Sequence, residues 1–424
     1  MATCWDAKVL EGTIVHIETI DRGGIDSRSV IEAYRIPSIR DVARIRVLVG
    51  EDAPCSVYVG RPVFEGLENP SAARGPAFDY ALLKVAHTVA AACSGLFALG
   101  VAECKIGMDG LTYTQAVRYM QALTGNTIRD RFRQRFSAAF NIHAKLFDDR
   151  DTGREPRAIT QPMDVARMAA RMTQEGGFEK VTWDGATDKA GSQPLIGQLK
   201  AAELLELVHD AHARGLETYI SAGMGPEEML VAAKVGVGGV GIGTRLHEAL
   251  ENKAITHLKM DAVRETLNAR DLGTQSAPGR AAAALAQLDW LMAAGNLPAE
   301  REPLRQGLHQ GLTAFHRAEK PIERHVAEGK LEPWLTESKA FLDGLRGASS
   351  DAAQQRRRAG ATGLDSHGEA EGAQEDPVLE TARAKLAALV AVHDPDAEEV
   401  SMMRSLAALI EAGDVEGLRY WLGV

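Results

Sequence analysis

The strongest constraint on the fold is a regular alternation of short β-rich runs with longer helical segments from Thr13 onward. The predicted strands are Thr13–Ile20, Cys55–Gly60, Val101–Gly107, Phe136–His143, Phe178–Asp184, Glu217–Ala222 and Val237–Gly243. We expect their central parts to be almost continuously apolar, which is typical of a parallel sheet covered by helices. Residues of about 12–270 are therefore predicted to form an α/β fold, a (β/α) barrel of the triosephosphate isomerase (TIM) type.

The segments between the strands carry apolar residues at helical spacing. In residues 38–49 the apolar side chains recur every third or fourth position, and Ser38 is a candidate N-cap. Further helices are predicted at Tyr113–Leu123, Pro162–Glu175, Leu199–Arg214 and Pro226–Val235. Residues 85–101 have the length of another barrel helix. No run of about 18 apolar residues occurs, so no membrane span is expected.

A barrel of this type has eight strands, but only the seven named above are predicted. Trp5–Gly12 have the pattern of a helix end, so we number the seven as strands two to eight. An apolar sheet edge would then remain between Thr13–Ile20 and Val237–Gly243. A rearranged N-terminal segment, the tail helices or a second subunit would cover it, and we favour a second subunit or partner. The alternative is a recorded chain that begins downstream of the true first strand.

After about Leu272 the sequence predicts a helical C-terminal extension. The expected division is 1–272 for the barrel, 273–346 for the helical extension, 347–376 for a disordered linker and 377–424 for a small helical module. The linker is rich in Gly, Ala, Ser, Arg and Glu. The last module is too small to be stable alone. We therefore expect its helices to dock on the barrel or to mediate contact with a second copy or a partner protein.

Charge and cysteine usage narrow the ligand classes. The net charge of -10 argues against nucleic acid, which needs a basic surface. The four cysteines form no CxxC pair, and no Cys/His cluster has zinc spacing, so neither a metal nor another cofactor is expected. Trp5, Asp6 and Lys8 interrupt any apolar run at the start of the chain. No signal peptide is therefore predicted, and a cytoplasmic location with free thiols is expected.

Glycines follow the last two predicted strands, where barrels of this type bind phosphate. Glycine lets backbone N–H groups approach phosphate oxygens, and a helix N-terminus favours an anion. The predicted phosphate-binding residues of these loops are Gly223, Gly225, Gly241, Gly243 and Arg245. The arginine would add a bidentate contact to a small phosphorylated substrate. Alternatively, the glycines only permit tight packing of strands against helices.

Charged side chains also stand at the C-terminal ends of predicted strands, the face on which barrel enzymes carry their active sites. Lys105, Asp184 and His143 are at strand ends, and Lys189 follows in a loop. A desolvated lysine forms a Schiff base with a carbonyl substrate, and a nearby aspartate moves protons or holds the lysine in place. These four are the candidate catalytic residues. The alternatives are a structural Lys–Asp pair at the rim or simple solvated lysines.

At these residues the sequence resembles the (5-formylfuran-3-yl)methyl phosphate synthases of methanofuran biosynthesis, over about residues 5–270. The matching blocks follow one another in the same order as in that family, and the resemblance rests on this shared order. They are residues 87–110 with Cys104-Lys105-Ile106-Gly107, residues 138–144, Asp184-Gly185-Ala186 with Lys189-Ala190-Gly191, residues 209–216, Ala222-Gly223 and residues 240–243.

The resemblance implies a lyase or synthase that joins two molecules of glyceraldehyde 3-phosphate into a furan phosphate. It implies lysine imines, aldol-type carbon–carbon bond formation and loss of water and phosphate, without a metal. Lys105, Asp184 and Lys189 match the family's active-site positions. The family has a further lysine after strand two, whereas residues 18–24 here have none. Arg22 stands there instead; its guanidinium stays protonated and forms no imine, so we assign it to phosphate binding.

Two other functions are compatible with the same residues. One keeps the phosphate site but runs another phosphosugar aldolase or isomerase reaction. The other is a non-catalytic barrel paralogue that has lost one lysine and binds a partner enzyme through its tails.

Overall fold

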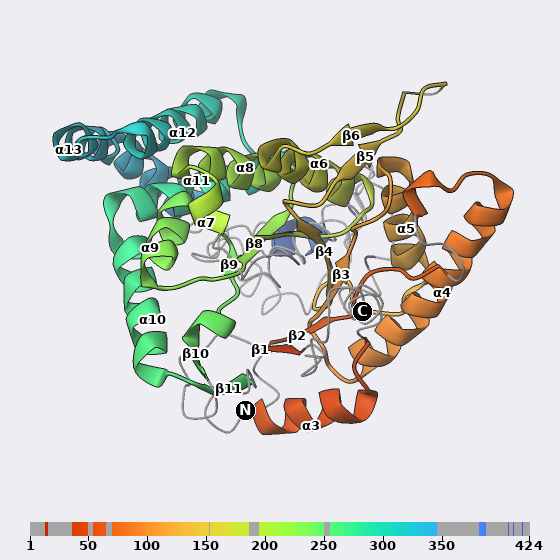
Figure 1. Cartoon of the computed structure of the whole chain (residues 1–424). Coiled ribbons are helices and arrows are strands. Elements are labelled where there is room, and N and C mark those ends of the chain that lie inside the picture. The colour runs from red at the N-terminus through yellow and green to blue at the C-terminus, as the bar shows by residue number, and fades with distance from the viewer. Residues whose placement is uncertain are drawn as a thin grey trace, which may run out of the picture.

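A curled, parallel β-sheet with helices around its outside forms the centre of the molecule (Figure 1). The computed structural model describes residues 13–15, 36–49, 54–64, 70–151, 153–185, 195–249, 255–345 and 381–386, together with Leu406, Ile410 and Leu418. The sheet has seven strands in the order β1-β2-β3-β4-β7-β8-β9. They are β1 Thr13–Val15, β2 Cys55–Tyr58, β3 Glu103–Gly107, β4 Arg135–Asn141, β7 Lys180–Asp184, β8 Glu217–Ser221 and β9 Gly239–Val240.

Each of the seven predicted strands corresponds to one strand of this sheet, and neighbours along the predicted series are neighbours in space. Every pairing between them is parallel. An α/β fold with a curled parallel sheet is therefore confirmed. The edge strands are β1 and β9, and no described pairing joins them. The N-terminal residues 1–12, where the first barrel strand was missing, lie outside the described part of the chain.

The predicted helices of this region are present, although the one predicted over residues 85–101 begins earlier, at Pro76. They are α3 Ile39–Val49, α4 Pro76–Ala98, α5 Tyr113–Asn126, α6 Pro162–Glu175, α8 Ala201–Ala213 and α9 Pro226–Val235. The sequence reading did not predict the short elements α7 Leu195–Gln198, the three-residue 3-10 helices η1 Pro70–Ala72 and η2 Thr244–Leu246, or the antiparallel pairs β5 Leu146–Asp148 with β6 Arg157–Ile159 and β10 His247–Ala249 with β11 Ile255–Leu258. Elements this short contain too few residues to show a period.

The strands are less apolar than expected, because polar residues alternate with apolar ones. On β3 and β7, Cys104, Ile106 and Trp183 point to the outside, where the Trp183 Nε1–H donates to the Ala166 carbonyl of α6. The residues between them point to the inside of the curl. The expectation of near-continuous apolar runs is therefore wrong for the inner face, and the reason is the period of two in a strand.

Charged residues on the inner face are paired with one another. The ammonium of Lys180 lies 2.6 Å from a carboxylate oxygen of Glu103. Arg135 on β4 and Glu217 on β8 are 2.5 Å apart, and both are buried. A buried charge without a partner is costly, so such pairing is what allows a polar interior.

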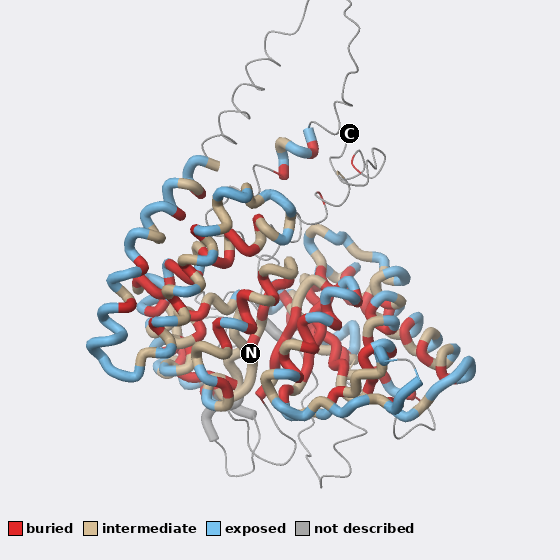
Figure 2. The backbone as a smooth tube through the Cα atoms, turned by 90° about the horizontal axis from the view of Figure 1, so that it is seen from above, coloured by how far each residue is buried: buried red, intermediate tan, exposed pale blue. Residues whose placement is uncertain are grey.

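The C-terminal helices are α10 Met260–Gln275, α11 Ala277–Ala293, η3 Ala299–Arg301, α12 Glu302–Arg317, α13 Pro321–Gly329 and a helix over residues 332–345. Three of them pack on the outer helices of the sheet, and among these α10 contacts α9. The helix α11 contacts α8 and α9, and α12 contacts α8. Buried leucines of α11 and α12 belong to the same hydrophobic cluster as Trp183. Figure 2 shows this burial along the strands and the inward faces of the helices.

The predicted domain boundary at residue 272 falls inside α10, and the extension shares its core with the sheet layer. The predicted linker, residues 347–376, lies outside the described residues. In the predicted terminal module, Ala382, Leu406 and Leu418 are buried.

By length and composition alone, α4 is apolar enough to cross a membrane, and it is the one such helix among the described residues. Its buried residues include Leu82, Ala86, Ala90 and Cys93. These recur at helical spacing, and α4 contacts β3 and α5. That pattern is typical of a helix lying on a sheet, and it makes length and composition weak grounds for a membrane span.

We expect Gly239→Ala to destabilise the fold, because a Cβ there would lie 2.6 Å from Cδ2 of Tyr219 on the neighbouring strand β8. Forced overpacking of this kind costs about 1–3 kcal/mol. Urea unfolding followed by circular dichroism measures the loss. Gly243→Ala is the matched control, since nothing lies within 4 Å of its Cβ position. Equal unfolding midpoints for both variants and the wild type would contradict the packing described here.

Candidate functional site

Lys105 is a buried amine on the inner face of β3. Only 8% of the surface of Lys105 is exposed to solvent. Its Nζ lies 5.9 Å from the ring centroid of Tyr58 and 5.6 Å from that of Tyr219. Among the residues that the structure describes, its ammonium forms no ion pair, whereas its neighbour Lys180 is paired with Glu103. The Lys105 amine therefore lies between two aromatic rings, and its Nζ is in no ion pair with a described residue.

Burial lowers the pKa of the Lys105 ammonium below its ordinary value, because a charged group loses solvation inside the protein. The carboxylates of Asp184 and Glu103 act in the opposite direction, and Lys180 lowers the pKa further. The net shift is downward, and it favours the neutral amine. The neutral amine is the form that attacks a carbonyl carbon.

Asp184 ends strand β7 and shares the interior with Lys105. The hydroxyl of Ser221, its register partner on β8, donates to Asp184 Oδ2 at 2.8 Å. Its charge raises the pKa of Lys105, which shows that the two side chains influence one another. Two of the predicted catalytic residues are therefore brought to the same inner face. Their roles in a reaction stay predictions.

Three inner-face residues belong to this site although the sequence reading did not name them as functional. Lys180 lies 2.6 Å from Glu103, and its Nζ lies 4.6 Å from the centroid of Tyr219. Burial alone raises the pKa of Glu103, but the ion pair and hydrogen bond with Lys180 hold it below its ordinary value. Burial raises the pKa of Tyr219, and the charges of Glu103 and Asp184 add to the shift. The signal for Glu103 and Lys180 was their even spacing from Lys105 and Asp184 on the same strands, which puts them on the same face. Tyr219 lies on β8, so this signal does not apply to it.

The turn after β8 is conformationally strained. Ala222 has a φ of 84°, the left-handed region that non-glycine residues rarely adopt, and Gly223 follows with a φ of 62°. Such residues occur disproportionately at functional sites. Here the strain lies directly after Ser221, the partner of Asp184.

The predicted phosphate loop after β8 is occupied by a carboxylate of the chain itself. The N–H of Gly225 donates to Glu228 Oε2 at 3.0 Å, as in a capping box at the start of α9. Arg245 lies 2.7 Å from the same carboxylate, and its Nη1 also donates to the carbonyl of Gly223. The predicted phosphate residues are thus gathered together, but Glu228 takes the position of the anion. A phosphate binding here must displace it.

The glycines of the second predicted phosphate loop are placed differently. The N–H of Gly241 donates to the Ile220 carbonyl, and a Cβ there would lie 2.8 Å from the hydroxyl of Tyr219. Gly241 is therefore used for strand pairing and packing, which was the alternative interpretation of these glycines. Gly243 has no described atom within 4 Å of its Cβ position, so packing does not account for this glycine.

His143 is exposed beyond the end of β4, and its ring is hydrogen-bonded to the side chain of Gln198. Gln198 in turn donates to the carbonyl of Gly185, the residue after Asp184. Through these contacts His143 lies at the same end of the sheet as Asp184, outside the buried interior. The predicted residues Lys189 and Arg22 lie outside the described part of the chain. The described group of side chains that could hold a metal ion lies elsewhere, between α8 and α11.

We expect the amine of Lys105 to titrate below the ordinary value of 10.5. Competitive labelling with an amine reagent across pH, read by mass spectrometry of the Lys105 peptide, measures the midpoint. Because the Asp184 charge raises this pKa, Asp184→Asn should move the midpoint to still lower pH. The exposed Lys84 serves as the internal reference. A Lys105 midpoint at or above that of Lys84 would rule out the activated amine.

We expect Glu228→Gln to strengthen phosphate binding at α9. The glutamine keeps the capping hydrogen bond to Gly225, while it removes the charge that competes with the anion. One charge at a helix N-terminus contributes about 0.3–1 kcal/mol, equivalent to roughly a two- to fivefold change in affinity. Calorimetric titration with inorganic phosphate measures it. Unchanged or weaker binding in a folded variant would place the phosphate elsewhere.

The chain matches no protein-family model and no curated protein, so the geometry of this inner face carries the argument for function.

Proposed function

We propose that the curled sheet belongs to a TIM-type (β/α) barrel and that the protein is a lyase or synthase acting through an imine on Lys105. The observation that carries this proposal is the buried Lys105 amine, which has a lowered pKa and no ion-pair partner among the described residues. A lysine held for structural reasons alone would be expected to pair with a carboxylate, as Lys180 does with Glu103.

The proposed reaction begins when the neutral Lys105 Nζ attacks the carbonyl carbon of the substrate. A proton taken up from solvent lets the carbonyl oxygen leave as water, and the nitrogen, which keeps one hydrogen, becomes a protonated imine. The positive charge then lies between the rings of Tyr58 and Tyr219, whose faces attract cations. The charged imine also weakens the bond to the neighbouring hydrogen of the substrate. Asp184 accepts that proton, and the resulting enamine carbon is the nucleophile for a second carbonyl.

The substrate class that we propose is a triose phosphate, with glyceraldehyde 3-phosphate as the leading candidate. This choice follows the resemblance to the furan phosphate synthases. In that reaction two trioses are joined, and water and phosphate are lost. The clustering of Gly223, Gly225 and Arg245 at the mouth of the sheet supports a phosphate position there once Glu228 is displaced.

A second candidate is another phosphosugar aldolase or isomerase that uses the same lysine. The absence of a lysine from residues 18–24 favours it, because the furan phosphate synthases have a further lysine there. Product analysis with glyceraldehyde 3-phosphate separates the two candidates: a furan product supports the synthase, and an acyclic product supports the aldolase.

We expect borohydride reduction in the presence of glyceraldehyde 3-phosphate or dihydroxyacetone phosphate to attach the triose to Lys105. Mass spectrometry of the digested protein locates the adduct. Lys105→Met should abolish it, whereas the matched variant Lys84→Met, at an exposed position of α4, should keep it. Asp184→Asn should retain trapping but slow turnover by about 10²–10⁴-fold, as the loss of an acid–base group does.

Absence of any adduct in the wild type would favour the non-catalytic paralogue that binds a partner enzyme. An adduct that persists in Lys105→Met would assign the imine to another lysine.

A further inference from the structure

A second polar group lies on the outer side of the sheet, between the outer helix α8 and the extension helix α11. His209 and His212 are on α8, where a spacing of three residues puts them on one face. Asp289 of α11 meets them there, with its Oδ2 2.7 Å from His209 Nδ1. The three residues are 2%, 0% and 0% exposed. We call them the α8–α11 triad.

Side chains of α12 and β8 form hydrogen bonds that hold the triad in position. Arg305 of α12 donates to Asp289 Oδ1 at 2.7 Å, which leaves the other carboxylate oxygen directed toward His209. The Thr218 hydroxyl lies 3.1 Å from His212 Nε2. Oriented partners behind metal-binding side chains are typical of metal sites.

The nitrogen of His209 that faces Asp289 is Nδ1. Its Nε2, across the ring, is buried without a hydrogen-bond partner. An ion held by both His209 and Asp289 would therefore bind Nδ1, and the carboxylate would exchange its hydrogen bond to that nitrogen for a bond to the ion.

The triad has the dimensions for one ion. Each residue offers one donor atom, and the three atoms all lie within 4.8 Å of one another. Some point therefore lies within about 2.8 Å of all three, whereas zinc bonds to nitrogen and oxygen are about 2.0–2.2 Å long. A movement of less than about 1 Å by each side chain closes that difference.

The chemistry of the triad selects the type of ion. Two imidazoles and one carboxylate suit zinc, and three protein ligands leave one position for water or another ligand. Arg305 adds positive charge nearby, but its hydrogen bond to Asp289 also fixes the carboxylate. A soft, thiolate-seeking ion has no partner here, since no cysteine is part of the triad.

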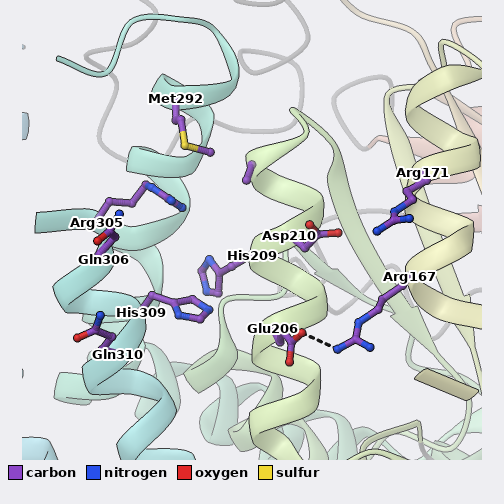
Figure 3. A pocket seen from close by; sticks show the side chains of 11 residues that line it. Arg167, Arg171, Glu206, His209, Asp210, Met292, Arg305, Gln306, His309 and Gln310 are labelled. Carbon is purple, nitrogen blue, oxygen red and sulfur yellow. Dashed lines mark hydrogen bonds and ion pairs between the residues drawn. The ribbon is translucent and has the colours of Figure 1, made fainter. Parts of the chain in front are cut away.

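A pocket beside the triad provides access from solvent. It has a volume of about 430 Å³ and is lined by residues of α6, α8, α11 and α12, His209 and Arg305 among them. Figure 3 shows the rings of His209 and His309 side by side between α8 and α12, and their centroids are 6.3 Å apart. Water or a small ligand in this pocket can reach the ion next to His209.

We propose that the α8–α11 triad binds one Zn²⁺ through His209, His212 and Asp289, with its fourth position toward this pocket. The ion fastens the helical extension to the outer layer of the sheet. It also makes the pocket a site for an anionic or water ligand separate from Lys105. The expectation that the chain binds no metal is revised by this proposal. Sequence spacing could not show the site, because Asp289 is distant from the two histidines along the chain.

The test uses the full chain after dialysis against a chelator. Titration with Zn²⁺ alone, followed by calorimetry, should show one ion per chain. Titration with Co²⁺ should give the visible absorption of a low-symmetry site with nitrogen and oxygen ligands. His209→Gln should weaken Zn²⁺ binding by at least about 100-fold, since loss of an outer partner alone typically costs 10–100-fold. His316→Gln is the matched control, a histidine of α12 that bonds to the Lys234 carbonyl instead; it should bind Zn²⁺ like the wild type.

No stoichiometric Zn²⁺ binding by the wild type would overturn the proposal. Equal binding by the wild type and folded His209→Gln would overturn it too. If His209→Gln does not fold, Asp289→Asn takes its place, with the same loss of affinity expected. If that variant also fails to fold, the wild-type Co²⁺ spectrum decides: imidazole-type absorption at one equivalent supports the site, and absorption of hydrated Co²⁺ alone rejects it.

Discussion

The need to pair buried charges governs the inner face of the curled sheet. Glu103 is committed to Lys180, and Glu217 is committed to Arg135. Both carboxylates are therefore already in ion pairs. Lys105 is left with two aromatic rings and the charge of Asp184 around it. A buried ammonium without a close counter-ion is unstable relative to its neutral form. The same pairing that makes a polar interior possible therefore leaves, in the described part of the sheet, a buried amine outside any ion pair.

Tyr219 connects this interior to the glycine-rich strand β9. Its ring lies beside both Lys105 and Lys180. A Cβ atom added at Gly239 or Gly241 would collide with the Tyr219 side chain. A side chain at either glycine would push the ring toward the lysines. Part of the glycine signal near residue 240 thus reflects room for an aromatic ring, whereas Gly223 and Gly225 form the turn at which an anion would bind. Glycines in one motif therefore serve two physical purposes, and the sequence alone does not separate them.

The order of strands and outer helices could be predicted from the sequence because helix and strand periods leave a direct trace in each segment. Pro162–Glu175 and Pro226–Val235, for example, begin at prolines that suit the first helical turn, and the structure has the same bounds. The placement of Lys105 and Asp184 on one inner face could also be predicted, because both stand near the C-terminal ends of strands, whereas their roles stay predictions. The partners were not found. Whether Lys180 meets Glu103 depends on packing between strands far apart in the chain, and whether Glu228 meets Arg245 depends on how the loop after β9 lies against α9. That the curled sheet belongs to a TIM-type barrel, with or without its first strand, stays a prediction.

The helical extension is joined to the candidate site by a continuous set of contacts. Asp289 of α11 meets His209, and the neighbouring ring of His212 is 5.4 Å away. His212 bonds to the Thr218 hydroxyl at the start of β8, and that hydroxyl also accepts the N–H of Gly238 before β9. Thr218 faces the helices, so the next residue, Tyr219, faces Lys105. Docking of the extension therefore acts on the outer side of the strand whose inner side holds the ring against the reactive amine. An extension that only covered apolar surface would need no buried polar contacts at this strand, because a leucine pair would stabilise the interface without the cost of desolvating a carboxylate.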